Sequence, residues 1–323
     1  MIEALLDLAT VGEPARQRMI VLVNASAGEI LQRGGPAFAQ QLTDLFRSAG
    51  VDADVNLVKG KHLAAKLRDL AAAHPTAQLV VAGGDGTISR LLPSLRLLRR
   101  TVGVLPLGTL NLLARDLGLG GTVHELVTGL TTATARPIDL GEVNGVPFHS
   151  NAGLGFLSRM AREREETRQR YPFSKAIGFA IAATRAMLLT KPVEVLMEVD
   201  GRMVQEVADA VLVTNNHFEG SPWTRPRLDQ GLLEVHLLRA GGLRGRVAAA
   251  VSVWRGTWRE LETLRSLTCR RVVINRRGKR SSTVAMDGEI RRFTHPLTFQ
   301  SLPGALQVLA ADTDRTDTDP TGA

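Results

Sequence analysis

The sequence predicts two domains, an α/β domain with a parallel sheet followed by a β-rich domain. A chain of 323 residues is long enough to form two hydrophobic cores. Strand and helix patterns alternate through the first 135 residues, which is typical of a doubly wound parallel sheet. After that point, Asn144-Gly145 and Asp200-Gly201 each separate two apolar runs and predict antiparallel hairpins. We therefore place a domain boundary near Ala135.

The strands of the first domain are recognised by their continuous apolar runs. Met19 to Val23 reads MIVLV, as expected of a strand that is buried on both faces. An apolar stripe from Phe38 to Phe46 predicts the next helix, which should end at Gly50. The capping box Thr122-x-x-Glu125 predicts the start of another helix. Further strands are expected at residues 51–58, 78–82 and 101–105, and further helices at 62–73, 87–98 and 110–117.

The second domain shows mostly strand patterns. A charged helix is expected from Arg159 to Arg170, with its mixed charges facing solvent, and an apolar helix from Ser174 to Leu189. The residues after Ala311 are acidic and rich in threonine, so we predict a disordered tail at 312–323. Strands are expected at residues 136–143, 146–150, 193–199, 203–207, 210–214, 232–238, 267–274 and 283–286.

Composition narrows the possible partners and the compartment. The formal net charge of +8 favours an anionic partner, but aromatic residues make up only 4% of the chain, so we expect no nucleic-acid partner. The single cysteine, Cys269, excludes an intrachain disulfide framework. The apolar stretch from Ala176 to Leu189 is too short to cross a bilayer and contains Arg185. Since the N-terminus also lacks a secretory signal, we expect a cytoplasmic protein that touches membranes from one side only.

The segment GGDGT, from Gly83 to Thr87, is the sharpest local signal for chemistry. It directly follows a buried strand and opens a helix, so its backbone N–H groups can surround an anion. Asp85 is placed to hold Mg²⁺ against phosphates, and the Thr87 hydroxyl is placed to donate to one. The alternative is an ordinary strand-to-helix turn whose glycines serve only steric needs.

Two further polar loops should lie beside GGDGT. One is PLGTLN, with Gly108, Thr109 and Asn111, and the other is NASAG, which begins at Asn24. Parallel strands place the loops that follow them at one edge of the sheet, where ligands bind in open α/β folds. We therefore predict one site built from three loops.

The combined motifs resemble the bacterial diacylglycerol kinase and sphingosine-kinase-like lipid kinase family. GGDGT is also found in NAD kinases, so the combination with PLGTLN and a late DGE is the more specific feature. The resemblance runs from about residue 19 to 310 through GGDGT (83–87), PLGTLNLLARDLG (106–118), RPIDLGEVNG (136–145), SNAGLGF (150–156), VTNN (213–216), DQGLLEV (229–235) and MDGEI (286–290).

The resemblance implies an NAD-kinase/phosphofructokinase-like α/β domain, a C-terminal β-sandwich, and an active site in the cleft between them. The nucleotide-binding domain would span residues 19–135, with about 302–311 returning to it, and the lipid-substrate domain would span 136–301. The activity implied is ATP-dependent phosphorylation of a lipid hydroxyl, as in phospholipid biosynthesis. The partners implied are a nucleotide and a lipid at the membrane surface, on its inner face.

The resemblance also implies roles for particular residues. ATP and Mg²⁺ would be the cofactors. Asp287, in the DGE segment, would be the general base that accepts the proton of the lipid hydroxyl, although Asp-Gly in isolation is usually a hairpin turn. The nucleotide-binding residues would be Asn24, Gly83, Gly84, Asp85, Gly86, Thr87, Gly108, Thr109 and Asn111, and the metal-binding residues would be Asp85, Asp139 and Asp229. Of two readings of Glu289, a neighbouring ligand or a surface strand residue, we slightly favour the second.

The chain departs from the family pattern at several positions. Leu112 stands where many members have an acid of the metal network, and Gln230 stands where many have a second aspartate. Ala25 and Ala27 occupy the loop where NPxSG is usual. These differences leave the metal ligands open.

Two other functions fit parts of the sequence. An NAD kinase-like enzyme with a soluble substrate would share GGDGT and a β-rich second half. A catalytically silent nucleotide-binding protein would explain the departures. No motif encodes which lipid is phosphorylated, and the oligomeric state, for which a homodimer is one option, is not encoded either.

Overall fold

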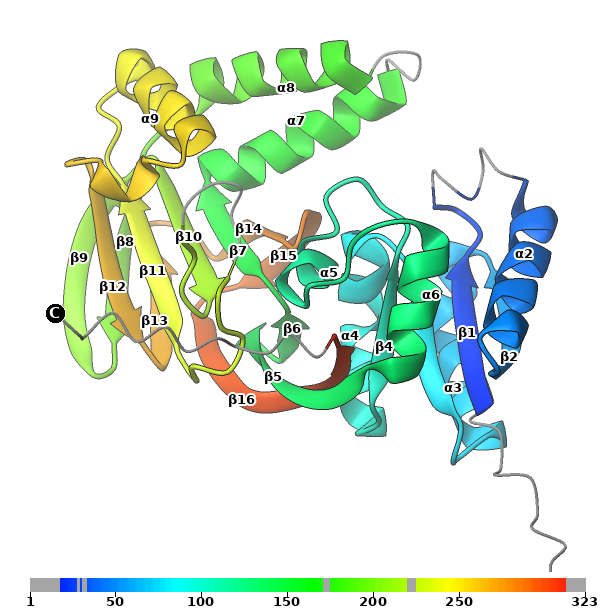
Figure 1. The fold of residues 1–323 in the computed structure, drawn as a ribbon. Coiled ribbons are helices and arrows are strands. Elements are labelled where there is room, and N and C mark those ends of the chain that lie inside the picture. The colour runs from blue at the N-terminus through cyan, green and yellow to red at the C-terminus, as the bar shows by residue number, and fades with distance from the viewer. Residues whose placement is uncertain (1–17, 28–29, 31–33, 171–174, 220–224, 312–323) are drawn as a thin grey trace, which may run out of the picture.

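The computed structural model describes residues 18–27, 30, 34–170, 175–219 and 225–311. The predicted fold class is confirmed, because an α/β half with a parallel sheet lies beside an antiparallel β-sandwich half (Figure 1). Three helices, α7 (Phe156–Arg170), α8 (Lys175–Leu189) and α9 (Leu243–Arg255), lie on the sandwich half, at the top of the view in Figure 1. Within these residues, no helix is long and apolar enough to span a membrane.

The parallel sheet has the strand order β2-β1-β3-β4. The strands β1, β3 and β4 are mostly buried because helices cover them, whereas β2, at the end of the order, is only partly buried. The apolar side chains of the sheet form one core together with the helices. The strands are β1 (Arg18–Asn24), β2 (Asp52–Val58), β3 (Gln78–Gly83) and β4 (Val102–Pro106). The helices are α2 (Gly35–Ser48), α3 (Leu63–Ala73), α4 (Asp85–Leu98), α5 (Leu112–Asp116) and α6 (Val123–Thr132).

The sandwich half consists of two layers around a second core. One layer is a six-stranded sheet of order β12-β11-β10-β7-β14-β15. Its strands are β7 (Asn151–Gly155), β10 (Ala210–Asn215), β11 (Leu233–Leu238), β12 (Leu264–Cys269), β14 (Ser281–Met286) and β15 (Glu289–Thr294). The other layer contains β8 (Val193–Val199), β9 (Arg202–Ala208) and β13 (Arg271–Arg276), with β5 (Thr134–Val143) and β6 (Val146–Phe148) alongside.

One long strand, β16 (Leu297–Ala310), joins the two halves and follows the lower side of the molecule in Figure 1. Its first part pairs with β13, and its last part pairs in parallel with β4 through Val308 and Val102. The strand is irregular between Leu302 and Leu306, where it passes from one half to the other. The domain limits given above therefore stay a prediction. The last part of β16 nevertheless adds a strand to the α/β sheet from the end of the described chain.

The predicted helix cap and the two predicted hairpin turns, which depend on a few neighbouring residues, are present. The Thr122–Glu125 capping box is present, with both of its reciprocal hydrogen bonds. The turns Asn144-Gly145 and Asp200-Gly201 have φ values of 46° and 82°, and of 44° and 85°. Both residues of each turn therefore occupy the left-handed region that tight hairpins require.

Some element limits were wrong. The strand expected at residues 267–274 is two strands, β12 and β13, which lie in different sheets. The chain changes sheet at Arg270, whose backbone N–H donates to the Asp200 carboxylate at 3.2 Å. Arg270 and Arg271 interrupt the apolar pattern at this point, but the predicted strand was extended across them. Strand β7 and helix α9 were not among the expected elements, and α5 is shorter than the helix expected at 110–117.

Candidate active site

A cavity of about 530 Å³ opens at the carboxyl edge of the parallel sheet. The loops after β1, β3 and β4 all contribute to its lining, as the sequence predicted. Residues after β2 and one residue of β15 complete it. The lining residues are Asn24, Ser26, Ala27, Lys59, Gly60, Lys61, Leu63, Gly84, Gly86, Thr87, Arg90, Leu107, Gly108 and Glu289.

Two of the glycine loops touch each other through their backbones. A Cβ placed on Gly108 would lie 2.6 Å from the Cα of Gly84. Asn111 holds the second loop by accepting from the Gly108 N–H and donating to the Gly108 carbonyl, both at 2.9 Å. Asn111 itself has a φ of 47°, a conformation that asparagine tolerates better than most residues. Glycine at both contact positions is therefore a steric requirement of the site.

The first loop is attached to the GGDGT segment by Asn24. Its Nδ2 donates to the Thr87 hydroxyl at 2.8 Å, and its Oδ1 accepts from the Ser26 N–H at 3.0 Å. This places Asn24 and Thr87 together at the start of α4, where backbone N–H groups without intrahelical partners favour an anion.

Only some of the predicted nucleotide-binding residues line the cavity. Asn24, Gly84, Gly86, Thr87 and Gly108 line the cavity. The others belong to the same loops without being part of its lining, and they are Gly83, Asp85, Thr109 and Asn111.

Three cationic side chains of the cavity were missed by the sequence analysis. Lys59 and Lys61 follow β2, and Arg90 extends from α4 towards them, so that a Cβ on Gly60 would lie 3.2 Å from its Nη1. A signal was present, because KGKH, residues 59–62, directly follows a strand whose last residue, Val58, pairs with Asn24. The three cations make the cavity suitable for a polyphosphate.

Glu289 brings a carboxylate from the sandwich half into this cavity. Its Oε1 lies 2.9 Å from the position of a Cβ on Gly86 and 3.9 Å from the Nη2 of Arg90. The favoured interpretation of Glu289 as a surface strand residue missed this position. The reason is that β15 meets the GGDGT loop only through the packing of the two halves.

Asp287 forms the turn between β14 and β15 with Gly288, and its φ is 46°. Its carboxylate accepts from three successive backbone N–H groups, those of His149, Ser150 and Asn151, at 2.9, 2.9 and 3.1 Å. The side chain has no exposed surface. The residue is therefore a hairpin turn and a buried anchor at the same time.

His149 lies beside Asp287, with its Nε2 3.6 Å from Oδ2 of the carboxylate. Both side chains are fully buried, and neither ring nitrogen of His149 has a hydrogen-bond partner within the described residues. A buried polar group of this kind normally has a hydrogen-bond partner. The His149–Asp287 pair can therefore form a further hydrogen bond with a water molecule or a substrate group.

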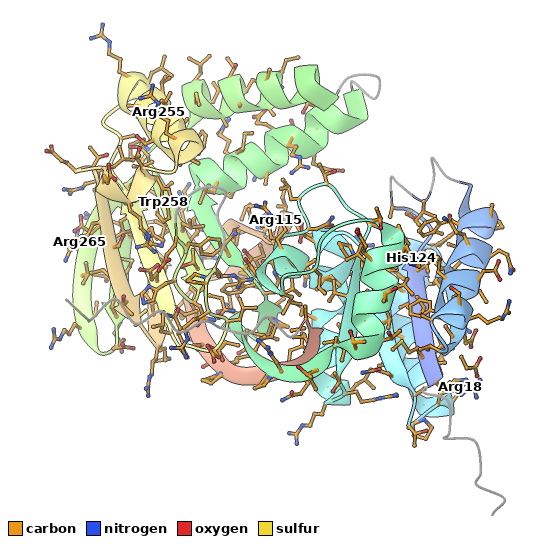
Figure 2. All side chains as sticks on the ribbon, viewed as in Figure 1. Arg18, Arg115, His124, Arg255, Trp258 and Arg265 are labelled. Carbon is orange, nitrogen blue, oxygen red and sulfur yellow. The ribbon has the colours of Figure 1, made fainter. Side chains whose placement is uncertain are left out.

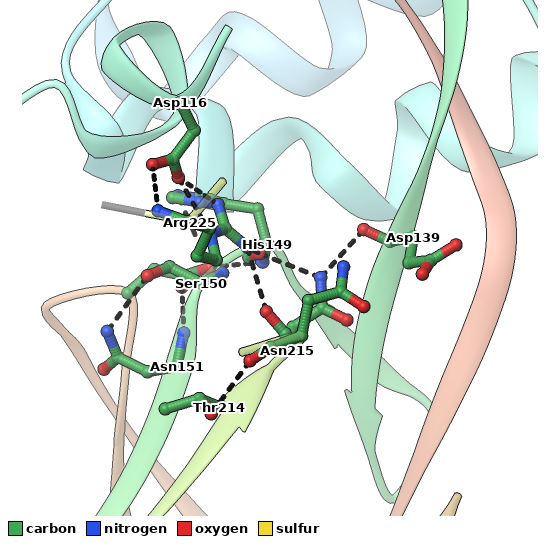
Figure 3. Close-up of polar contacts among 10 residues, drawn as sticks. Asp116, Asp139, His149, Ser150, Asn151, Thr214, Asn215 and Arg225 are labelled. Carbon is green, nitrogen blue, oxygen red and sulfur yellow. Dashed lines mark hydrogen bonds and ion pairs between the residues drawn. The ribbon is translucent and has the colours of Figure 1, made fainter. Parts of the chain in front are cut away.

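A buried ion pair connects the two halves next to this pair (Figure 3). Arg225 donates through Nε and Nη2 to Asp116 of α5 at 2.8 and 2.6 Å, and its Nη1 donates to the carbonyl of His149. Asn215 also donates to that carbonyl, at 3.1 Å. Asp116 lies in the PLGTLNLLARDLG segment, but nothing in the sequence identifies a partner 109 residues away.

The three aspartates expected to bind metal are in different surroundings. Asp139 is buried, and its carboxylate accepts from the N–H groups of Gly231 and Gly304 at 2.6 and 2.9 Å. Asp229 is exposed and pairs with Arg227 at 3.1 Å. Asp85 is the first residue of α4. Across the described residues, no cluster of three or more aspartate, glutamate, histidine or cysteine side chains could hold a metal ion.

Fold and cavity together define a class of protein. A glycine-rich loop at a helix start, three cations and a carboxylate from a second domain suit a phosphotransferase with its site between an α/β domain and a β-sandwich.

The comparisons agree with this class. A family model for the diacylglycerol kinase catalytic domain matches residues 18–143, and one for the YegS C-terminal NAD kinase beta sandwich-like domain matches residues 153–310. The chain belongs to the bacterial diacylglycerol kinase-like lipid kinase family, and it is a lipid kinase.

Relatives match over most of the chain or over little more than a third of it. A diacylglycerol kinase from Bacillus subtilis is 27% identical over 74% of this chain and 80% of its own length. A diacylglycerol kinase from Mycobacterium tuberculosis is 27% identical over 82% and 86%. A probable lipid kinase YegS-like protein from Pseudomonas aeruginosa is 37% identical over 37% of this chain and 40% of its own. A crystal structure of a putative diacylglycerol kinase from Bacillus anthracis has a TM-score of 0.72 at 20% identity, over 93% and 99% of the chains, which shows the shared fold.

Proposed function

We propose that this lipid kinase transfers the γ-phosphate of ATP, with Mg²⁺, to a hydroxyl of diacylglycerol or a related lipid. The observation that carries the proposal is the first cavity, where the GGDGT loop, three cations and Glu289 meet. Relatives named diacylglycerol kinase support the choice of acceptor.

The cavity offers several groups to the phosphates of a nucleotide. The start of α4 would receive one phosphate among the N–H groups of its first turn, next to the Thr87 hydroxyl. Lys59, Lys61 and Arg90 would balance the remaining negative charge. ATP bound with Mg²⁺ supplies the transferable phosphoryl group and part of the charge neutralisation that the reaction needs.

The carboxylates near the loop fit a Mg²⁺ ion that arrives with the nucleotide. Such an ion is usually held by one or two carboxylates together with phosphate oxygens and water, rather than by a cage of protein ligands. Glu289 lines the cavity, and Asp85 starts α4 in the loop beside it. We propose these two as the metal ligands. Asp139 fits less well because backbone N–H groups already occupy its carboxylate.

We propose Asp287 as the general base. Among the described residues, its Oδ2 accepts a hydrogen bond only from the His149 N–H, so one lone pair is left for a hydroxyl. The lipid oxygen would form a bond to the γ-phosphorus as the bond to the bridging oxygen of ADP breaks, and its proton would pass to Asp287. The three N–H donors fix the carboxylate, and the unpartnered His149 ring beside it could hold the same hydroxyl.

We propose that the lipid is reached at the membrane surface from the cytoplasmic side. The hydroxyl of diacylglycerol lies at the level of the headgroups, so the enzyme would need to touch only the surface of the bilayer. The net charge of +8 favours contact with an anionic surface.

The test is transfer of labelled phosphate from ATP to a lipid extract by the wild type, Asp287→Asn, Glu289→Gln and Glu262→Gln, an exposed control. We expect a labelled lipid with the wild type and the control. Asp287→Asn should lower turnover by roughly 100- to 10,000-fold. Glu289→Gln should lower it by about tenfold or more and raise the Mg²⁺ concentration that is needed.

Asp287→Asn also weakens the anchor of the His149–Asn151 backbone, so its melting temperature and ATP binding must be measured in parallel. A folded variant that binds ATP but does not label lipid supports the role as a base. Label in NAD without lipid would instead indicate the NAD kinase-like function. ATP binding without transfer to any acceptor would indicate a silent nucleotide-binding protein.

A further inference from the structure

A second cavity, of about 540 Å³, lies under the helix pair α7 and α8 on the sandwich half. It shares no lining residue with the first cavity. Its walls come from the start of α7, the segment after α8, and the strands β13, β14 and β15. The proposed kinase reaction makes no use of it.

The lining of this second cavity is strongly cationic. Five basic side chains contribute, and no aspartate or glutamate does. The five are Arg159, Arg162, Lys191, Arg276 and Arg292. At neutral pH such a cavity attracts an anion, because its charges have no counter-charge within the lining.

The arginines are paired with hydroxyl groups rather than with carboxylates. Arg162 donates to Thr283 at 3.1 Å, Arg276 to Ser282 at 3.3 Å and Arg292 to Ser281 at 3.0 Å. The three acceptors are consecutive residues of β14. A hydroxyl that accepts from an arginine can still donate its own proton, so the pairs of Arg162 and Arg292 can each offer several donors to a bound oxyanion. The Ser282 hydroxyl also contacts Nε2 of His295, at 2.9 Å.

Two of the arginines are partly removed from water, and their hydrogen bonds do not fully replace the lost hydration. The Nε of Arg159 is buried with no hydrogen-bond partner among the described residues, and its nearest carboxylate, that of Glu163, is 3.9 Å away. Burial also lowers the pKa of the Arg276 guanidinium. Placing a charge out of water is costly unless it is paired, so an anion with several oxygens would stabilise this arrangement.

We propose that this cavity is a second phosphate-binding site, which takes the phosphate group of a phosphorylated glycerol compound, either a lipid headgroup or a soluble phosphate ester. Guanidinium groups match the geometry of phosphate oxygens and bind them through paired hydrogen bonds. Leu189 at the edge of the cavity and its neighbour Leu188 are exposed by 48% and 58%, which suits the acyl region of a lipid.

The site is positioned to influence the proposed base. The strand β14 begins with Ser281, Ser282 and Thr283 in the second cavity and leads directly into the turn at Asp287. Phosphate binding would therefore order one end of the hairpin whose other end carries Asp287 and Glu289. Binding of phosphate to the second cavity does not depend on this coupling.

The test compares two double variants that each remove two positive charges. Arg162→Gln/Arg292→Gln removes exposed arginines of the cavity, and Arg202→Gln/Arg270→Gln removes exposed arginines near the turn at Asp200-Gly201, at the other end of β8. Binding is measured without ATP to phosphatidylcholine vesicles with and without phosphatidic acid, and by titration with sn-glycerol 3-phosphate. Phosphatidic acid is the product of the proposed reaction and can also bind the first cavity, so the second cavity is assessed from the difference between the two double variants, both of which leave the first cavity unchanged.

The cavity variant should bind phosphatidic acid vesicles about 20- to 30-fold more weakly than the wild type, since each basic residue contributes roughly fivefold. The control pair should change binding by less than about threefold. Loss on vesicles alone assigns the site to a lipid headgroup, and loss with glycerol phosphate alone assigns it to a soluble ester.

Two results would overturn the proposal. One is an equal loss of binding in the two double variants, which would mean that only the overall charge matters. The other is an absence of binding to either probe by the wild type. Melting temperatures within a few degrees of the wild type establish that each variant is folded. Should the cavity variant melt early, the single variants Arg162→Gln and Arg292→Gln replace it, and each should weaken binding by roughly fivefold.

Discussion

At the scale of single residues, Gly108 is the position where a small change should have a large effect. A Cβ there would meet the Gly84 Cα at 2.6 Å and the Asn111 Oδ1 at 2.7 Å. Because the first of these atoms belongs to the backbone, Gly108→Ala should force the two loops apart. We expect a loss of stability of about 1–3 kcal/mol and ATP binding weakened by about tenfold or more, measured by urea denaturation and calorimetric titration.

Gly129 provides the matched control for this substitution. It lies within α6, and a Cβ built on it meets nothing within 4 Å. Gly129→Ala should therefore stabilise the protein by about 0.5–1 kcal/mol, because alanine is the better helix former. Similar ATP affinities for the two variants would contradict the steric requirement at Gly108.

Glu234 on β11 is a second residue with a measurable consequence. It is buried, and its carboxylate lies 2.8 Å from the Nδ1 of His217 and 2.5 Å from the Nη2 of Arg259. Burial by itself raises the pKa of this carboxyl, but hydrogen bonds from His236, Arg259 and His217 favour the charged form more strongly. The result is a pKa of about 2, compared with an ordinary value of 4.5.

A depressed pKa means that the folded protein binds fewer protons at Glu234 than the unfolded chain does. The stabilisation is fully present above about pH 4.5 and is lost as the pH falls towards 2, by up to roughly 3 kcal/mol. Urea denaturation between about pH 5 and pH 3 should show a flatter pH dependence for Glu234→Gln than for the wild type. The exposed Glu262→Gln should retain the wild-type slope, and equal slopes for all three proteins would contradict the assignment.

The residues of the candidate site differ in how far the sequence could predict them. The glycines of GGDGT and PLGTLN were found because each segment directly follows a buried strand, and that information is local. Lys59 and Lys61 could have been predicted in the same way, because they also directly follow a strand. A pair of lysines after a strand is, however, common on protein surfaces. Glu289 was considered as a ligand, but the sequence could not decide between that role and a surface strand residue, because its position depends on the contact between the two halves.

At the scale of elements, a buried ion pair attaches α5 to the sandwich half. Asp116 and Arg225 are exposed by only 2% and 1%. Asp116→Asn keeps an acceptor for the Arg225 backbone N–H but leaves the guanidinium buried without a counter-charge. We expect a loss of about 3–5 kcal/mol in the free energy of unfolding.

The double variant separates this pairing from a general loss of packing. Arg225→Met removes the charge together with its need for a partner, so Asp116→Asn should cost much less in that background. A double-mutant cycle by chemical denaturation should give a coupling of roughly 1–3 kcal/mol. Costs that simply add within about 0.5 kcal/mol would rule out the direct pairing.

Elements were predicted best where their signals are local. The capping box and the Asn-Gly and Asp-Gly turns all form as expected, because a few neighbouring residues determine their backbone angles. The split between β12 and β13 was missed, although Arg270-Arg271 interrupts the apolar pattern, because no local signal shows that the two strands join different sheets. Sheet membership depends on partners far away in the chain.

At the scale of the whole molecule, β16 contributes to both cores. Leu297 and Phe299 lie in the core of the sandwich half, and Leu306, Val308 and Leu309 lie in the core of the α/β half. We therefore expect the halves to unfold together. Leu309→Ala, at a residue that is 1% exposed, should destabilise both by about 2–5 kcal/mol.

Tryptophan fluorescence makes this prediction measurable. All three tryptophans are at position 223 or later, and Trp258 lies in the sandwich half (Figure 2). The fluorescence midpoint of Leu309→Ala in urea should therefore shift as much as its circular dichroism midpoint. Val235→Ala, in the core of the sandwich half, is the control that should shift both as well. An unchanged fluorescence midpoint in Leu309→Ala would show that the halves unfold separately.

The fold class was predictable from the sequence because alternating and continuous apolar patterns distinguish the two halves. The sharing of one strand between two cores was not visible in those patterns, and it was expected only from the family resemblance. A run such as LTFQSLPGALQVLA specifies burial but not which core each residue enters.

The path of β16 also has a consequence for the order in which a newly made chain can mature. Translation delivers β1 to β4 early, yet the strand that pairs with β4 at Val308 leaves the ribosome about 200 residues later. Until then β4 presents an open hydrogen-bonding edge and the α/β half lacks part of its interior. Ribosome-bound chains that stop before residue 297 should therefore be clients for chaperones, and competence to bind ATP should appear only once residue 310 has emerged.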